Sequence, residues 1–213
     1  MKKLNKIKSL LEKNYNFKGI NYIYFPQTRN ELIELIESLI NQYGNNVDLN
    51  NIDVSDIEDF RSIFYKCKKF NGDVSEWDVA KGKYFRSIFY KCKKFNGDVS
   101  EWDVSNGEYF DSMFFQCYKF NSNLSKWDVS NNEHFNYMFH DCYKFNSDLS
   151  KWDVSNGQKF EWMFYNCKLF DADLSRWNVE RAKSWVSFAK DSLLANYPER
   201  IPERFRDDYL KTT

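Results

Sequence analysis

Five cysteines and two histidines are the side chains of this sequence best suited to metal binding or covalent catalysis. Thiolate metal sites use close pairs such as C-x-x-C together with histidine, whereas each cysteine here stands alone. His134 and His140 have no obvious serine or cysteine partner. We therefore expect no metal, no cofactor, no small-molecule substrate and no enzymatic activity. The cysteines recur every 25 residues, at Cys67, Cys92, Cys117, Cys142 and Cys167.

Disulfide bonds are not expected either. The number of cysteines is odd, and the start of the chain, MKKLNKIKSLLEK, lacks the apolar stretch of a secretion signal. Cysteines on stacked neighbouring repeats would lie roughly 5 Å apart, close enough for bridging. Because each cysteine falls on an apolar face, we interpret all five as small, reduced core residues.

Two columns of charged residues are candidates for partner binding. Four aspartates alternate with inward-facing Trp and Val, so we expect them to point outward from a sheet. Either serine hydroxyls and backbone N–H groups hold these carboxylates, or a basic partner or cation binds them. A neighbouring column changes sign along the chain. The aspartates are Asp78, Asp103, Asp128 and Asp153, and the second column is Glu76, Glu101, Lys126, Lys151 and Arg176.

Basic residues concentrate in the first two full repeats. We expect them to align into one stripe on a row of helices, either as a solvated face or as a site for an acidic protein surface or a nucleic-acid backbone. They are Arg61, Lys66, Lys68, Lys69, Arg86, Lys91, Lys93 and Lys94. Later repeats carry aromatic residues instead, which we expect to be exposed and available for an interface: Phe115, Tyr118, Tyr137, Tyr143, Trp162 and Tyr165.

A 25-residue repeat must position all of these side chains. The segment FRSIFYKCKKFNGDVSEWDV occurs unchanged at 60–79 and 85–104. In one repeat, an apolar i, i+3, i+4, i+7 pattern from Phe110 to Phe120 predicts a helix of about three turns. Leu124, Trp127 and Val129 follow the L-x-x-L-x-L strand pattern of leucine-rich repeats. The period is too short for the propeller blade of about 40–45 residues that a Trp-Asp pair would otherwise suggest, so we assign the Trp column to the core.

The sequence thus predicts an α/β solenoid, leucine-rich-repeat-like, with one short parallel strand and one short helix per repeat and helical caps at both ends. Residues 1–59 form an N-terminal helical cap and a degenerate repeat, 60–184 five full repeats, and 185–213 a partial repeat and C-terminal cap. Apolar residues from Leu4 to Leu11 predict an amphipathic helix. A capping box at Thr28–Glu31 begins a second helix, from about Arg29 to Tyr43, which Gly44 ends. At the other end we expect Phe205, Tyr209 and Leu210 to cover the open core.

The repeat resembles the BspA-like leucine-rich-repeat family of bacterial proteins. The matching pattern is M-F-x-x-C-x-x-F-N-x-x-L-S-x-W-D-V-S-N, as at Met138–Asn156, and the resemblance spans roughly residues 35–195. Many members are surface proteins implied in adhesion, and they share no enzymatic activity. The resemblance therefore implies a binding protein.

Charge and hydropathy narrow the setting. The formal net charge is +0, so no global basic field favours nucleic acid or membrane. No apolar run approaches the roughly 18 residues of a membrane span, and we expect a cytoplasmic protein without a membrane partner. The main hypothesis is an intracellular scaffold for protein–protein interaction, with nucleic acid a further partner through basic repeats one and two. The alternatives are a phage or mobile-element inhibitor, which docks on a host defence enzyme or its nucleic acid, and a bacterial surface adhesin.

Overall fold

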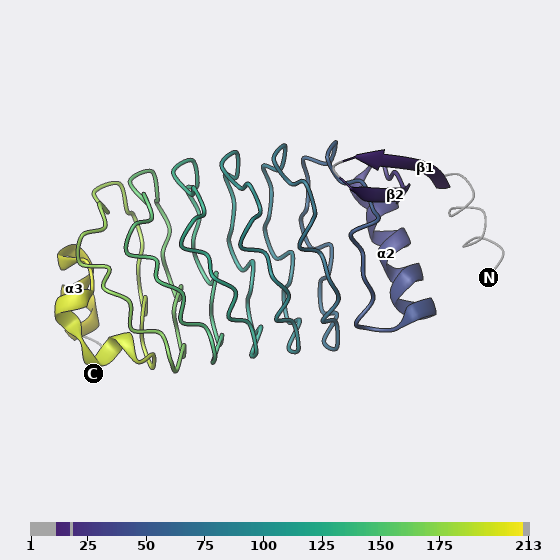
Figure 1. Cartoon of the computed structure of the whole chain (residues 1–213). Coiled ribbons are helices and arrows are strands. Elements are labelled where there is room, and N and C mark those ends of the chain that lie inside the picture. The colour runs from purple at the N-terminus through teal and green to yellow at the C-terminus, as the bar shows by residue number, and fades with distance from the viewer. Residues whose placement is uncertain (1–11, 18, 211–213) are drawn as a thin grey trace.

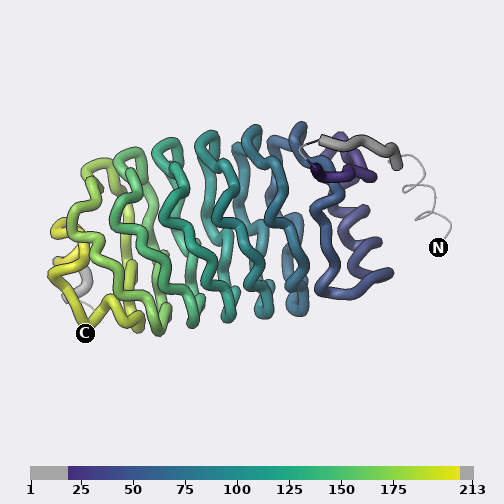
Figure 2. Tube along the Cα trace, viewed as in Figure 1, coloured from purple at the N-terminus to yellow at the C-terminus, as the bar shows by residue number. Residues whose placement is uncertain are grey.

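The chain forms an elongated stack of 25-residue coils with a helix at each end (Figures 1 and 2). This computed structural model describes residues 12–17 and 19–210. The amphipathic helix expected over Leu4–Leu11 lies outside the described residues. The regular elements, in chain order, are β1 (Glu12–Phe17), β2 (Ile20–Tyr24), α2 (Arg29–Tyr43), the 3₁₀ turns η1 (Leu194–Asn196) and η2 (Pro198–Arg200), and α3 (Glu203–Leu210).

A hairpin and a helix close the N-terminal end of the stack. β1 and β2 pair antiparallel, and Gly19 between them has a φ of +85°, a conformation that glycine adopts without strain. The N–H of Ile23 donates to the carbonyl of Asn51, at 2.9 Å, and so joins β2 to the first coil. α2 has the bounds predicted from its capping box. The Oγ1 of Thr28 accepts from the N–H of Glu31, whose carboxylate accepts from the N–H of Gln27.

The three-turn helix expected in each repeat does not form. Between α2 and η1 the described chain contains turns and isolated parallel bridges. Ser62 and Lys66 have φ values of +58° and +62°, and every later coil repeats this pair of left-handed residues. Each costs roughly 1–2 kcal/mol and interrupts an α-helix. The apolar pattern nevertheless faces inward as predicted, because Phe60, Ile63 and Phe64 are all buried.

Hydrogen bonds between coils replace those within a helix. The N–H groups of Phe60, Ser62, Phe64 and Lys66 donate to carbonyls of the next coil at 2.7–3.0 Å. We call this side of the stack, residues 58–66 and their equivalents every 25 residues, the ladder side. Such parallel pairing satisfies the backbone groups that a helix would have paired internally.

The opposite long side, residues 71–79 and equivalents, is the Trp side, where side chains link the coils. The indole N–H of Trp102 donates to the carbonyl of Val74 at 2.9 Å, and the other four repeat tryptophans make the same bond one coil apart. The segment expected to be a strand, Leu124–Val129, forms a turn instead, in which the N–H of Trp127 donates to the carbonyl of Leu124.

Aromatic columns fill the space between the two sides. Phe64, Phe89, Phe114, Phe139 and Phe164 stack with ring centroids 5.1–5.7 Å apart, and all five are fully buried. The Trp residues of the repeat are also buried, as predicted. At the C-terminal end, Phe205 of α3 packs on Trp185 with ring centroids 5.1 Å apart and covers the last coil. The side chains of Tyr209 and Leu210, expected to help there, lie outside the described residues.

Candidate functional site

The structure divides the eight predicted basic residues among three places. Arg61 and Arg86 lie on the ladder side and are already paired: Arg61 Nη2 lies 2.7 Å from Asp59 Oδ2, and Arg86 Nε lies 2.8 Å from Asp111 Oδ2. With Tyr84, Tyr109, His134 and Lys159 among others, the two arginines line a groove of about 300 Å³. They are therefore not free charges of a continuous stripe.

Lys66 and Lys91 lie against a ladder of stacked aromatic rings. The ammonium of Lys66 lies 4.8 Å from the ring centroid of Tyr65, and that of Lys91 lies 5.2 Å from the ring centroid of Tyr90. The ladder runs through five coils at centroid spacings of 4.6–4.8 Å, and its members are Tyr65, Tyr90, Phe115, His140 and Tyr165. These rings stabilise one another.

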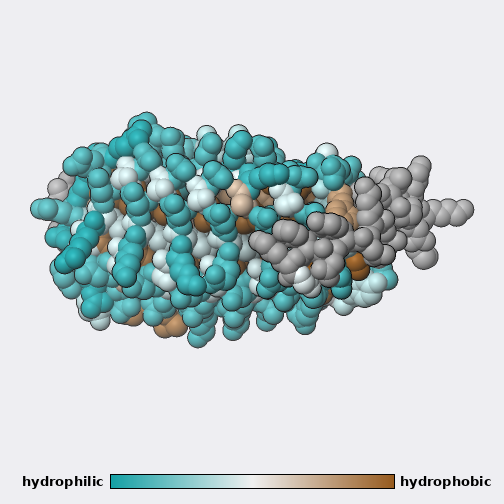
Figure 3. Space-filling view, turned by 45° about the horizontal axis from the view of Figure 1, so that its top comes forward, coloured by the Kyte–Doolittle hydropathy of each residue, from teal (hydrophilic) through white to brown (hydrophobic). Residues whose placement is uncertain are grey.

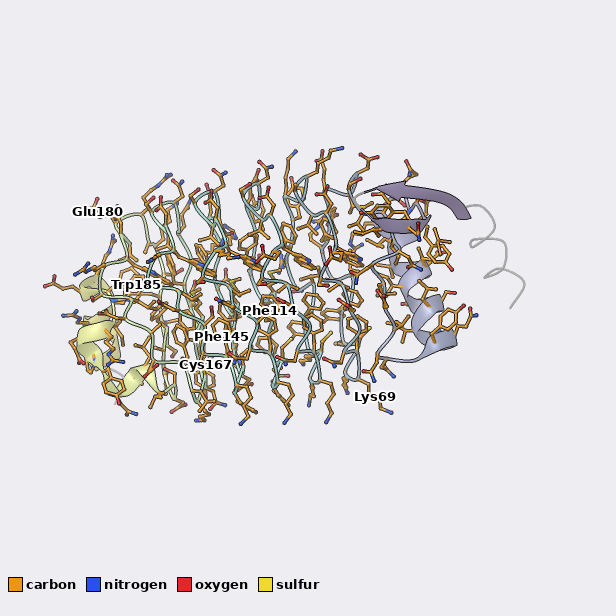
Figure 4. The ribbon with its side chains drawn as sticks, in the orientation of Figure 1. Lys69, Phe114, Phe145, Cys167, Glu180 and Trp185 are labelled. Carbon is orange, nitrogen blue, oxygen red and sulfur yellow. The ribbon has the colours of Figure 1, made fainter. Side chains whose placement is uncertain are left out.

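The remaining four lysines lie where the chain turns from the ladder side to the Trp side. Figure 4 places Lys69 at one edge of the stack and Glu180 at the opposite edge. Lys69 and Lys94 are exposed, and the ammonium of Lys93 lies over the ring of Tyr118 at 4.9 Å. The other member of this group is Lys68. The single predicted stripe is thus split, and only these four form an edge.

The aromatic residues of the later repeats are less available than predicted. Three half-buried aromatic rings surround His140. Their centroids lie 4.7, 5.9 and 6.1 Å from the centroid of its ring, for Tyr165, Tyr137 and Trp162 respectively. Burial lowers the pKa of His140, so its ring is neutral at pH 7. Tyr118 and Tyr143 stack on each other at 4.7 Å. The cluster is held together by its own contacts.

The aspartate column of the Trp side holds local turns. The Oδ1 of Asp103 accepts from both the N–H and the hydroxyl of Ser105, at 3.1 and 2.7 Å. Asp78, Asp128 and Asp153 likewise accept from the N–H two residues later. The interpretation by local hydrogen bonds thus accounts for one oxygen of each carboxylate. All four side chains are exposed, which leaves the second oxygen for a partner.

Acidic residues gather at the N-terminal end of the Trp side. A groove of about 620 Å³ is lined by five carboxylates and, where β2 meets the first coils, by Ile20 and Tyr22. Burial and the nearby carboxylates raise the pKa of the Tyr22 hydroxyl. No lysine or arginine lines this groove among the described residues. We call it the acidic groove, and its carboxylates are Asp53, Glu76, Asp78, Glu101 and Asp103.

In the column that runs from Glu76 to Arg176, an ion pair joins the last acidic residue to the first basic one. Lys126 Nζ lies 2.7 Å from Glu101 Oε1, and both side chains are exposed. Lys126 and Lys151 line a separate groove of about 540 Å³ further along the Trp side, and Arg176 is exposed beyond it. The predicted acidic and mixed ends of this column therefore belong to two different hollows.

His140 Nδ1 lies 3.2 Å from Asp141 Oδ2, but the described cysteines and histidines do not gather into a metal site. Within the part of the chain that the structure describes, no three His, Cys, Asp or Glu side chains form a group suited to a metal ion. All five cysteines are free thiols, and four are buried. Their thiols serve the stack, as the Sγ of Cys117 lies 3.0 Å from the carbonyl oxygen of Phe89 in the preceding coil.

Three lysines that the sequence analysis passed over continue the edge of Lys68 and Lys69. They are Lys119, Lys144 and Lys168. The signal was present in the sequence, since Lys119 and Lys144 lie 50 and 75 residues after Lys69. The face in Figure 3 is largely hydrophilic, with hydrophobic residues visible only in places between rows of polar ones.

A family model described as "Mycoplasma protein of unknown function, DUF285" matches residues 34–133 and 110–197. The chain belongs to this family. The two matches cover the stacked coils and overlap, as expected for a repeated unit. No curated protein and no solved structure matches the chain. Among the described residues of this DUF285 member, no helix has the length and apolar character needed to cross a membrane.

Proposed function

We propose that this DUF285 member is a non-enzymatic binding protein, a repeat scaffold whose acidic groove holds a basic segment of a protein partner. In architectural terms we propose a leucine-rich-repeat-like solenoid of the BspA-like type, in which turns take the place of the helices. The single observation that carries the functional proposal is the groove itself, where five carboxylates, of which Glu101 is paired with Lys126, lie beside an apolar wall without a lysine or arginine in the lining.

The charge of the groove supports this proposal. The formal net charge of the chain is +0, yet the groove concentrates negative charge in the first coils. Stacked carboxylates repel one another, and a partner with lysine or arginine side chains offsets that repulsion. Ile20 is half-buried and adds apolar surface of the kind that protein interfaces bury at their centres, whereas Tyr22 is only 8% exposed.

Neutral, nearly isosteric substitutions test the groove without breaking its turns. In Glu76→Gln/Asp78→Asn/Asp103→Asn, the asparagines keep an Oδ1 acceptor, as Asn178 does when it accepts from the N–H of Glu180. We expect this variant to fold normally and to lose at least tenfold in affinity for a partner captured by cross-linking from cells and then purified.

The control is Asp128→Asn/Asp153→Asn, which removes two carboxylates of the aspartate column outside the groove. It should bind the purified partner as the unmodified protein does. Equal affinity of the groove variant and this control for every captured partner would show that the carboxylates serve the turns alone.

A further inference from the structure

One edge of the stack carries seven lysines, two per coil in the first two coils and at least one in each of the next three. We call them the basic edge. They are Lys68, Lys69, Lys93, Lys94, Lys119, Lys144 and Lys168. Six are exposed and Lys93 is half-buried. None forms an ion pair within the described residues, and Lys168 Nζ donates to the carbonyl of Asp191 at 3.0 Å. The remaining three edge positions hold Tyr118, Tyr143 and Leu169.

The pitch of the edge is set by the core directly beneath it. The phenylalanines that follow the edge residues, from Phe70 to Phe170, stack with ring centroids 5.6–6.0 Å apart. Like charges on neighbouring coils at this pitch repel one another, and salt screens the repulsion only in part. Leu169 shows that the fold does not require lysine there. The repulsion is therefore a feature that a ligand of opposite charge explains.

Side chains next to the edge add hydrogen-bond donors. The Oδ1 atoms of Asn71, Asn96 and Asn121 each accept from the N–H of the asparagine one coil on, at 2.8–2.9 Å. Their exposed amide N–H groups remain for a ligand. Two residues further along the chain from Asn96 and Asn146 are Asp98 and Asp148. The N–H groups of Ser100 and Ser150 hold the pKa values of these carboxylates below their usual range, so they stay charged. They confine a negatively charged ligand to the narrow edge.

We propose that the basic edge binds a single phosphodiester strand, RNA or DNA, that runs along the coils and contacts them through its phosphates. A linear ligand with regularly repeated charge fits a linear row of lysines at constant pitch. The edge is two residues wide, which suits one strand better than the two strands of a duplex. Since Lys93 and Tyr143 pack against the ring of Tyr118, that ring does not offer a free stacking platform, and binding is independent of base sequence.

A membrane surface fits the edge less well. Leu169, 43% exposed, is the only large exposed hydrophobic residue on this edge in the described chain. Peripheral membrane segments combine basic residues with an apolar face that enters the headgroup region, and this edge has no such face. The inference goes beyond the proposed protein partner, and it uses a different surface from the acidic groove.

The test measures binding of a fluorescein-labelled oligothymidylate, long enough to span five coils, by anisotropy at increasing NaCl. For single strands each neutralised phosphate contributes about −0.7 to the slope of log affinity against log salt, so full engagement of the edge gives about −5. Lys119→Gln/Lys144→Gln/Lys168→Gln should bind more weakly and reduce the steepness of that slope by about 2.

Three lysines where the chain turns from the Trp side back to the ladder side provide the matched control, Lys81→Gln/Lys83→Gln/Lys183→Gln. They are already occupied, because Lys81 and Lys83 pair with Asp56 and Glu58 and Lys183 donates to Gln158. This variant removes the same charge and should keep the parent slope. Asp78→Asn in the acidic groove should also leave it unchanged.

Four results would overturn the proposal. They are no binding of the oligonucleotide at low salt, equal losses in the two triple variants, equal affinity for polyglutamate, and binding of phosphatidylserine vesicles without binding of the oligonucleotide. The third would assign the edge to acidic proteins and the fourth to membranes.

Discussion

The two long sides of the coil stack are held together by different chemistry. On the ladder side, backbone N–H groups donate to backbone carbonyls of the next coil, for example from Ser87 to Asp111 at 3.0 Å. On the Trp side, the bonds between coils come largely from side chains: indole N–H groups, Asn oxygens and Ser hydroxyls, as when Ser147 Oγ accepts from the N–H of Leu124 at 2.8 Å.

This difference explains where the repeat tolerates variation. Backbone bonds place no demand on the outward side chain, and one ladder-side position is Arg61, Arg86, Asp111, Asn136, Glu161 and Val186 in successive coils. The Trp side repeats its Trp in five coils and its Asp-x-Ser pattern with few changes. Strict repetition of the Trp therefore marks a side chain that bonds the coils, whereas the ladder side keeps its bonds between coils when the outward residue changes.

The largest expected effect is the loss of a Trp-side bond and its ring. Trp127 is 4% exposed, and its indole N–H donates to the carbonyl of Val99 at 2.9 Å. Trp127→Ala should lower the free energy of unfolding by about 3–5 kcal/mol, measured by urea denaturation. Trp127→Phe keeps a ring but removes the indole donor. Because the carbonyl of Val99 still accepts from the N–H of Trp102 at 3.3 Å, this variant should cost only about 1 kcal/mol.

Arg61→Ala on the ladder side is the contrasting substitution. Its pair with Asp59 is exposed, and its removal should cost less than about 1 kcal/mol. A Trp127→Ala cost as small as that of Arg61→Ala would mean that side-chain bonds do not hold the Trp side.

Sequence periodicity predicted the inward pattern of the coil but not its backbone. Successive tight turns bury Phe60, Ile63 and Phe64 as a helix would, so the same apolar spacing fits both conformations. What excludes the helix is pairing with the next coil through left-handed residues such as Lys66, a long-range contact that local propensity does not report. The bounds of α2 were predictable because its cap residues act locally.

In the candidate site, too, the repeat predicts some features, whereas contacts between distant parts of the chain decide others. The columns of charge could be located from the repeat alone, since residues 25 positions apart must stack. The ion-pair partners of these charged residues could not be predicted in the same way. The pair of Arg86 with Asp111, for example, depends on which side chains of neighbouring coils turn toward each other. The wall of Ile20 and Tyr22 was also missed, as it belongs to a hairpin outside the repeat.

A smaller effect is expected for the cysteine column, which joins neighbouring coils through its thiols. Burial raises the pKa of the Cys117 thiol well above its usual value, and Cys117→Ala should cost about 1–2 kcal/mol through the lost contact with Phe89. Cys67 is half-buried at the end of the column. In the folded protein a thiol reagent should modify Cys67 first, and all five sulfurs should react at one rate only after denaturation. Rapid modification of Cys117 in the folded protein would contradict its burial.

The smallest effects should have opposite signs of pH dependence on the two sides. On the Trp side, the N–H and hydroxyl of Ser100 lower the pKa of Asp98, so its stabilisation is present above the unfolded pKa of about 3.9 and is lost as pH falls through the lower folded value. On the ladder side, burial raises the pKa of Asp111 despite the nearby Arg86. Stability then falls as pH rises from about 3.9 through the raised value.

Urea midpoints across pH 2–7 should therefore show that Asp98→Asn removes a loss of stability on acidification, whereas Asp111→Asn removes a loss on going to neutral pH. Asn123, which accepts from the N–H of Ser125 at 3.0 Å, shows that asparagine preserves the turn at the position of Asp98. If both variants changed the pH profile in the same direction, the two sides would not differ in how they bury charge.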